Sequence, residues 1–220
     1  MPDFPFAVVA FDLDGTLADT APDLAGALNH TLVALGRPAI EPAAVRNLIG
    51  HGARALLRRG LAASGEAPEA LVEIGYPIFL EYYSAHICEG TSLFPGVGEA
   101  LDDIERAGAA VALCTNKPEA LTRRLLDALG CSGRFAAVVG GDTLPVRKPD
   151  PAPLLEAIAR SGGGRSAFVG DSITDADTAR AARLPFVAVS FGFSDRPVEA
   201  LGADRVIDRF EDLKGALERL

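Results

Sequence analysis

The chain has 220 residues, of which 49% are hydrophobic, enough apolar material for one substantial core with or without an inserted unit. Its formal net charge is -9, and no block of lysine or arginine stands out, so the composition argues against nucleic acid and anionic membranes as partners. No apolar run approaches the length that spans a bilayer. An anionic small molecule would therefore need a local cluster of positive charge.

The three cysteines form no C-x-x-C pair, and their odd number is typical of unpaired thiols in a reducing compartment. The first five residues, Met-Pro-Asp-Phe-Pro, lack the basic stretch followed by a longer apolar one that marks a secretory leader. These observations predict a cytoplasmic protein. Monomer and homodimer are both left open.

The first predicted strand, residues 7–11, is continuously apolar, as expected of a central parallel strand buried on both faces. Asp12 and Asp14 follow at its carboxyl end, where ligands bind in open α/β sheets, and Gly15 permits a tight turn. Two carboxylates so close together repel each other, and a divalent cation is the simplest way to keep both ionised. The stretch indicates metal-assisted chemistry, and an Asp-Gly turn with solvated acids is the alternative.

The segment after Thr20 has helical periodicity and no convincing strand. Helices are predicted over residues 22–36, 41–48, 53–63 and 68–86. A helical block placed directly after such a strand is typical of a cap that covers a site and moves relative to it, and helices that only pad the core are the alternative. The predicted domains are a core of residues 1–18 and 91–220 and a helical cap of residues 19–90.

From residue 97 onward, helices and strands alternate, which predicts an α/β fold with parallel βαβ units and a doubly wound sheet. A helix is expected over residues 97–106, strands over residues 109–114, 136–139, 166–169, 186–189 and 205–207, and a last helix from Glu211.

Two of these later strands precede candidate phosphate ligands. Thr115 and Asn116 follow one strand end, where a hydroxyl and an amide suit phosphoryl oxygens, although helix capping is the alternative. Lys148 stands just before two prolines, so its ammonium can be aimed at a site, whereas a lone lysine is otherwise a solvated surface charge.

The strand over residues 166–169 is followed by two more acids. Asp171 could complete a metal site of hard oxygen ligands. Asp175 could orient Lys148 or a metal-bound water, or it could favour its own helix N-terminus through the dipole. The strand ends together present a set of side chains that fits phosphoryl transfer through a carboxylate nucleophile.

Four segments resemble, in order and spacing, the four motifs of the haloacid dehalogenase superfamily. They are DLDGT at residues 12–16, TNK at 115–117, KPDP at 148–151 and GDSITD at 170–175. Further stretches resemble the phosphoglycolate phosphatase branch, namely IGHGARALL at 49–57, LFPGV at 93–97, GGDTLPVRKPDP at 140–151, VSFGF at 189–193 and DRVIDRFEDL at 204–213. The resemblance covers nearly the whole chain. One departure is Arg183, which stands near a helix end where the family often has glycine.

The resemblance implies a Rossmann-like core with an inserted helical cap and Mg2+-dependent hydrolysis of a small phosphomonoester, with 2-phosphoglycolate as the expected substrate. It implies that Asp12 attacks phosphorus and that Asp14 protonates the leaving oxygen and then activates water. The implied Mg2+ ligands are the Asp12 carboxylate, the Asp14 backbone carbonyl and Asp171. The implied phosphate ligands are Thr115, Asn116 and Lys148.

Recognition of the organic part of the substrate is expected from the cap, because the core motifs are occupied with phosphate and metal. Gly50, His51 and Gly52 precede a helix whose N–H groups and dipole can bind a carboxylate. His51, Arg54 and Arg58 fall on one face of that helix, which predicts a local positive patch, and an ordinary solvated basic face is the alternative.

Other functions share parts of this pattern. A receiver-type signalling domain also uses clustered acids, a phospho-accepting aspartate, a hydroxyl and a lysine, but the helical insertion and Asp14 argue against it. A haloacid dehalogenase needs neither the second acid nor a metal. A sugar phosphomutase, or a phosphatase for another small phosphorylated metabolite, shares the nucleophile and the acid, so the sequence separates them only through the cap.

Overall fold

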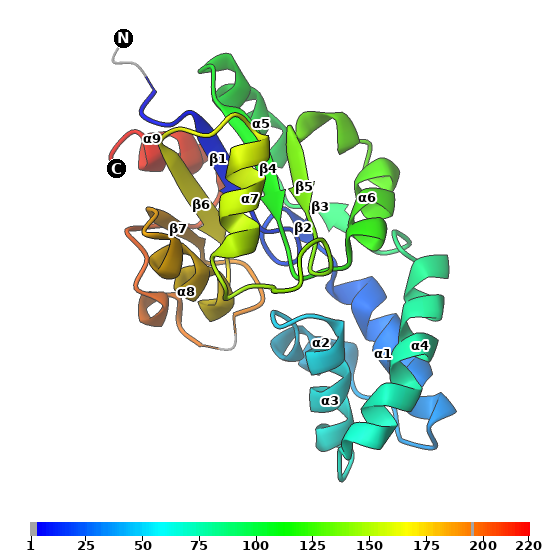
Figure 1. Ribbon diagram of the computed structural model, residues 1–220. Helices are drawn as coiled ribbons and strands as arrows, with labels where there is room; N and C mark the ends of the chain where they lie inside the picture. The colour runs from blue at the N-terminus through cyan, green and yellow to red at the C-terminus, as the bar shows by residue number, and fades with distance from the viewer. Residues whose placement is uncertain (1–3, 195) are drawn as a thin grey trace.

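The computed structural model describes residues 4–194 and 196–220 (Figure 1). Residues 1–3, on which the prediction about a secretory leader partly rests, lie outside the described residues. Among the described residues, the structure contains no helix with the length and apolarity needed to span a bilayer.

Within the described residues, one sheet of six parallel strands has the order β5-β4-β1-β6-β7-β8. The strands are β1 (Val8–Phe11), β4 (Ala110–Cys114), β5 (Ala137–Val139), β6 (Ser166–Gly170), β7 (Phe186–Val189) and β8 (Arg205–Ile207). Val8 of β1 pairs with Ala110 on one side and with Ser166 on the other, and all four residues of β1 are buried. The strand order reverses between β1 and β6, so the binding crevice of such a sheet lies beyond the carboxyl ends of these two strands.

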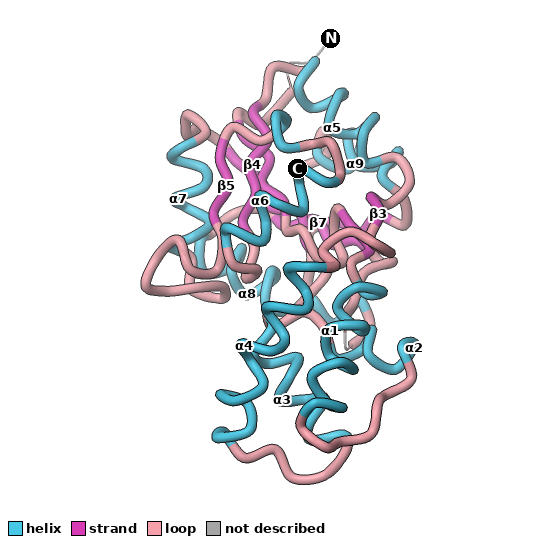
Figure 2. Tube along the Cα trace, turned by 90° about the vertical axis from the view of Figure 1, so that its right-hand side faces the viewer, coloured by secondary structure: helices cyan, strands magenta, loops and turns pink. Residues whose placement is uncertain are grey.

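Helices cover both faces of the sheet, which lies between them in the side view (Figure 2). On one face lie α7 (Ala152–Arg160) and α8 (Ile173–Ala182); on the other lie α5 (Val97–Arg106), α6 (Glu119–Ala128) and α9 (Leu213–Leu217). Short 3-10 helices span Arg46–Leu48, Ser132–Arg134, Val198–Leu201 and Phe210–Asp212. The two faces bury separate apolar clusters, because strands buried on both faces send alternate side chains to each side. This arrangement confirms the predicted Rossmann-like α/β fold.

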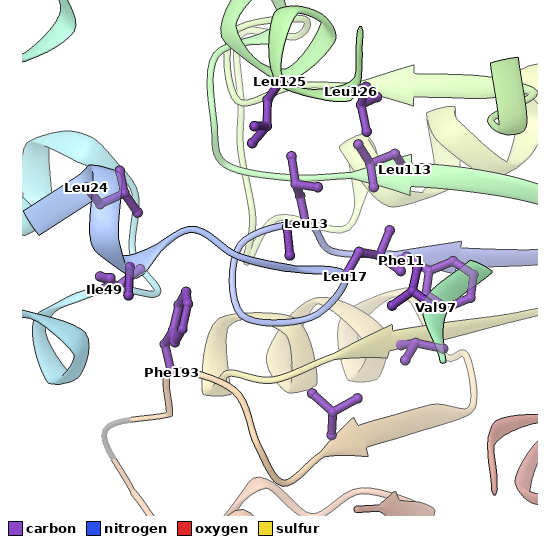
Figure 3. Packing of buried hydrophobic residues seen from close by; sticks show 14 of the residues in the cluster. Phe11, Leu13, Leu17, Leu24, Ile49, Val97, Leu113, Leu125, Leu126 and Phe193 are labelled. Atoms are coloured by element: carbon purple, nitrogen blue, oxygen red, sulfur yellow. The ribbon is translucent and has the colours of Figure 1, made fainter. Parts of the chain in front are cut away.

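A bundle of helices, here called the helical unit, extends beyond the carboxyl edge of the sheet (Figure 1). It consists of α1 (Ala21–Ala34), α2 (Pro42–Val45), α3 (Ala53–Ala63) and α4 (Glu69–Ala85). Its apolar side chains join the cluster on the α5 face of the sheet, and Figure 3 shows Leu24 and Ile49 of this region close to Phe193, which follows β7. The exact division into a core and a cap of residues 19–90 stays a prediction.

Some local features depart from the sequence-based prediction. Two antiparallel strands of two residues each, β2 (Ala18–Asp19) and β3 (Ser92–Leu93), tie together the two connections to the helical unit and are too short for a periodic signal. The helix expected over residues 41–48 breaks after Val45 into a 3-10 turn. Arg183 ends α8 with φ of 57°, the left-handed conformation that glycine adopts more easily.

Candidate active site

Asp12 and Asp14 lie on the turn that leaves β1, at the crevice between β1 and β6. Gly15 has φ of 82°, and a Cβ atom there would lie 2.3 Å from Oδ2 of Asp171. The turn therefore needs glycine both for its backbone conformation and for the close approach of Asp171. The Leu13 backbone N–H donates to Oδ1 of Asp12 over 2.7 Å, which fixes that carboxylate at the strand end.

Three carboxylates converge beside this turn. Oxygens of Asp12, Asp171 and Asp175 all lie within 4.8 Å of one another. Burial raises the pKa of Asp12 to about 7. The nearby ammonium of Lys148 lowers this pKa, and the neighbouring acids raise it. Burial, together with the charges of Asp175 and Asp12, also raises the pKa of Asp171 well above its ordinary value. The cluster carries more negative charge than Lys148 alone neutralises, which is the setting in which a divalent cation binds.

The donor atoms around the cluster fit a hard metal ion. Asp171 is held by the Phe193 backbone N–H (2.6 Å) and by the Thr16 hydroxyl (3.2 Å), while its carboxylate retains further lone pairs. The backbone carbonyl of Asp14 accepts no hydrogen bond among the described residues. Two carboxylates and one carbonyl, those of Asp12, Asp171 and Asp14, are the kind of oxygen ligands that hard divalent cations prefer.

Lys148 links two of the acids. Its buried Nζ lies 3.0 Å from Oδ1 of Asp12 and 2.6 Å from Oδ1 of Asp175. The other carboxylate oxygen of Asp175 accepts from the backbone and the hydroxyl of Ser172, completing a capping box at the start of α8. Asp175 thus makes both contacts that the sequence left as alternatives: it orients the lysine and begins the helix.

Thr115 and Asn116 lie on the turn after β4. The Thr115 hydroxyl oxygen accepts from the Lys117 backbone N–H over 3.3 Å, so its own hydrogen remains a donor. The Asn116 side-chain N–H donates to the Lys148 carbonyl over 3.0 Å, and its Oδ1 is buried without a hydrogen bond among the described residues. Asn116 therefore braces the segment that carries Lys148, and its direct contact with phosphate stays a prediction.

A pocket separates these turns from the helical unit. The residues that line it are Asp12, Asp14, Leu24, Ile49, Gly50, Gly52, Ala53, Leu56, Phe79, Leu80, Tyr83, Thr115, Asn116, Lys117, Pro118 and Leu121. Its cavity volume is about 40 Å³, which leaves room for a few water molecules because one needs about 10–15 Å³. The pocket therefore suits a small ligand.

The structure brings only part of the predicted cap site to this pocket. Gly50 and Gly52 line it, whereas His51 and Arg54 are not among the lining residues. The guanidinium of Arg54 pairs with Glu73 and lies over the ring of Tyr76. The second arginine of the predicted patch, Arg58, pairs with Glu69. Because α3 packs along α4, acids of α4 neutralise the positive patch that the sequence of α3 predicts.

Lys117 is the functional candidate that sequence reasoning missed. Its buried Nζ lies 2.8 Å and 2.9 Å from the two carboxylate oxygens of Asp14, and it lines the pocket. The signal was present in the TNK motif, where only the first two residues were assigned roles. Sequence reasoning also gave no role to the two groups that hold Asp171. The Thr16 hydroxyl belongs to the DLDGT motif, whereas the Phe193 backbone N–H leaves no trace in residue identity.

Comparison with known proteins places this geometry in a family. Residues 9–189 match the family model described as haloacid dehalogenase-like hydrolase. The chain belongs to this family. The hydrolase is 48% identical over 217 residues to a phosphoglycolate phosphatase of Caulobacter vibrioides, an alignment that covers 96% of this chain and 90% of that protein.

Two further comparisons agree. A phosphoglycolate phosphatase of Mesorhizobium japonicum is 45% identical over 217 residues, with 97% of this chain and 96% of that protein covered. The crystal structure of a predicted phosphoglycolate phosphatase from Haemophilus somnus superimposes with a TM-score of 0.88 at 31% identity and covers 95% of this chain and 96% of that one. The hydrolase is accordingly an enzyme of the phosphatase class, as predicted.

Proposed function

We propose that this phosphatase hydrolyses 2-phosphoglycolate to glycolate and phosphate, with Mg2+ as its cofactor and an aspartyl-phosphate as its intermediate. One observation carries the proposal: two aspartates on a single turn have different surroundings. Both line the pocket, but Asp12 lies among acids beside Lys148, whereas Asp14 pairs with Lys117. The names of the two curated relatives, which this chain matches over nearly its whole length, support the choice of substrate.

Asp12 is the proposed nucleophile. Its carboxylate oxygen forms a bond to phosphorus while the bond from phosphorus to the ester oxygen breaks. Asp14, which enters this step in its protonated form, gives its proton to the leaving oxygen. In the second step, Asp14 accepts a proton from water as that water attacks the phosphorus of the aspartyl-phosphate. Phosphate leaves, and both aspartates return to their starting states.

The neighbouring residues have supporting roles in this proposal. When bound, Mg2+ offsets the charge that otherwise keeps a carboxylate away from a phosphoryl group. The Asp12 and Asp171 carboxylates and the Asp14 carbonyl would hold it. The proposed holders of the phosphoryl oxygens are Thr115, Asn116 and Lys148. Asp175 keeps the Lys148 ammonium in place through its ion pair of 2.6 Å.

The helical unit is proposed to act as a cap that excludes water from the reaction. Gly50 and Gly52 line the pocket at the beginning of α3, where helix N–H groups face outward. We propose that this turn, which contains His51 and is followed by Arg54, lies next to the organic part of the substrate.

A panel of small phosphomonoesters, assayed with and without Mg2+, tests the proposal. We expect the highest kcat/KM for 2-phosphoglycolate and near-complete loss of turnover without the metal. Preference for a different ester by tenfold or more would assign the enzyme to another metabolite, and isomerisation of a sugar phosphate would make it a mutase. A stable phosphoprotein without turnover would support the receiver-type alternative.

A further inference from the structure

The wall of the pocket has an uneven charge distribution. Toward the helical unit it is made largely of apolar side chains, namely Leu24, Ile49, Leu56, Phe79 and Leu80. Among the described residues that line the pocket, Lys117 is the single cationic one. An anionic group on the organic part of a substrate would therefore meet one positively charged side chain in this pocket.

Lys117 is held so that it stays charged. Its side chain is 4% exposed, and its Nζ also lies 4.7 Å from the centre of the Tyr83 ring. The Asp14 carboxylate is in direct contact with the buried ammonium and offsets the cost of burying its charge. An ammonium has three N–H donors, and Asp14 is its single carboxylate partner among the described residues. A second carboxylate can therefore share the ammonium.

Tyr83 supplies an unexplained polar group at the same place. Its side chain is 1% exposed, and its buried hydroxyl lies beside the Lys117 ammonium. An ammonium can only donate, so the hydroxyl hydrogen has no acceptor among the described residues. Leaving a buried hydroxyl unpaired is unfavourable, so such a group in a pocket points to a ligand atom. Burial raises the pKa of Tyr83 to about 12, which keeps the hydroxyl a neutral donor near pH 7. Tyr83 lies on α4 of the helical unit, whereas Lys117 lies on the turn after β4.

We propose that Lys117 and Tyr83 together bind a carboxylate carried by the substrate on the carbon next to the ester oxygen. The proposal rests on the proposed function, in which Asp14 meets that ester oxygen. In 2-phosphoglycolate one methylene separates the ester oxygen from the carboxyl carbon, and the Lys117 ammonium is in direct contact with Asp14. A carboxylate on that methylene comes within reach of the ammonium and of the Tyr83 hydroxyl, because both residues line the same pocket.

This site has two consequences for specificity. A substrate with a methyl group in place of the carboxylate would leave the hydroxyl unpaired, and sites built from buried polar groups reject such analogues strongly. The carboxylate would also connect a residue of the helical unit to a residue of the sheet edge. Binding of the correct substrate would therefore hold the helical unit closed over Asp12.

Binding of two non-hydrolysable phosphonates tests the proposal by calorimetry in the presence of Mg2+. The probe 3-phosphonopropionate replaces the ester oxygen of 2-phosphoglycolate with a methylene and keeps the carboxylate, and propylphosphonate lacks the carboxylate. For Lys117→Met we expect 3-phosphonopropionate to bind about 10- to 100-fold more weakly, the range for a bond to a charged group. For Tyr83→Phe we expect a weakening of about two- to tenfold. Propylphosphonate binding should weaken about threefold or less in both variants.

A matched control is Arg124→Ala, because Arg124 on α6 contacts Ser84 on α4 at the surface, outside the pocket. It should bind both phosphonates as the unchanged enzyme does. Equal weakening of the two phosphonates in Lys117→Met, or an unchanged preference for 3-phosphonopropionate in Tyr83→Phe, would overturn the assignment of the carboxylate site. If Lys117→Met does not fold, Tyr83→Phe alone decides, because it removes one oxygen atom. If the unchanged enzyme itself shows no preference for 3-phosphonopropionate, the choice of 2-phosphoglycolate fails as well.

Discussion

The two sides of the pocket are built by different physical means. On the sheet side, contacts from distant segments fix each carboxylate, as Thr16 and the Phe193 backbone fix Asp171. On the side of the helical unit the wall is largely apolar apart from Tyr83. Arg54 and Arg58 of α3 pair with acids of α4 and do not line the pocket. This difference supports the proposal that the sheet edge carries the chemistry and that the helical unit contributes enclosure and selectivity.

The largest effect is expected on the sheet side at the proposed nucleophile. Asp12→Asn should lower kcat by about a thousandfold or more, because an amide is neither the nucleophile nor an anionic metal ligand. Steady-state kinetics with 2-phosphoglycolate measures the change. Asp177→Asn, on the exposed side of α8, is the control and should keep the normal rate. A near-normal rate for Asp12→Asn would contradict the covalent mechanism.

The loss of rate in Asp14→Asn should depend on the leaving group, unlike the loss in Asp12→Asn. Asp14→Asn should lower the rate by about a hundred- to ten-thousandfold for alkyl phosphates, the usual range for loss of a general acid, and by much less in the first step for esters of acidic alcohols. The variant should still bind Mg2+, since Asp14 is proposed to contribute its backbone carbonyl. Equal losses for both classes of ester would show that Asp14 does not donate the proton.

Metal binding at the sheet edge should also raise the free energy of unfolding of the protein. At a Mg2+ concentration of about 100 times Kd, binding to the folded state adds about 2.7 kcal/mol to the free energy of unfolding. For a chain of this size that corresponds to a rise in Tm of roughly 5–10 °C, measured by calorimetry after removal of metal with a chelator and again after addition of Mg2+. Asp171→Asn should remove most of the rise. A Tm that does not respond to Mg2+ would contradict the proposed metal site.

The smallest effect is expected at the beginning of α3. The double variant His51→Ala with Arg54→Ala should raise KM for 2-phosphoglycolate by about two- to fivefold, because a screened charge near a helix N-terminus contributes roughly 0.3–1 kcal/mol. KM for a neutral aryl phosphate should change less. Arg58→Ala, one turn further along, is the control and should change neither. The fold increase in KM can be compared with the fold loss of 3-phosphonopropionate affinity in Lys117→Met. If the increase in KM is as large or larger, the carboxylate binds at this turn and not at Lys117.

The sequence predicted the sheet and the strand-end residues well, because apolar runs identify buried parallel strands and the carboxyl ends of such strands meet at one edge. Asp12, Asp171 and Asp175 converge for that reason. The partners of Lys117 and Arg54 could not be predicted, because they depend on which helices pack together and on how side chains turn after a strand. Helical periodicity identified the basic face of α3 but not the acids of α4 opposite it.

The most direct test of the account is to trap the phosphoryl group on the enzyme. Asp14→Asn is mixed with Mg2+ and a phosphate ester of an acidic alcohol, quenched in acid and digested, and its peptides are analysed by mass spectrometry. Loss of Asp14 slows the attack of water more than the first transfer, so we expect the peptide that contains Asp12 to carry a phosphoryl group, with the modification on Asp12 itself. Release of alcohol and phosphate together without any phosphorylated peptide, or a phosphoryl group on a different residue, would contradict the account.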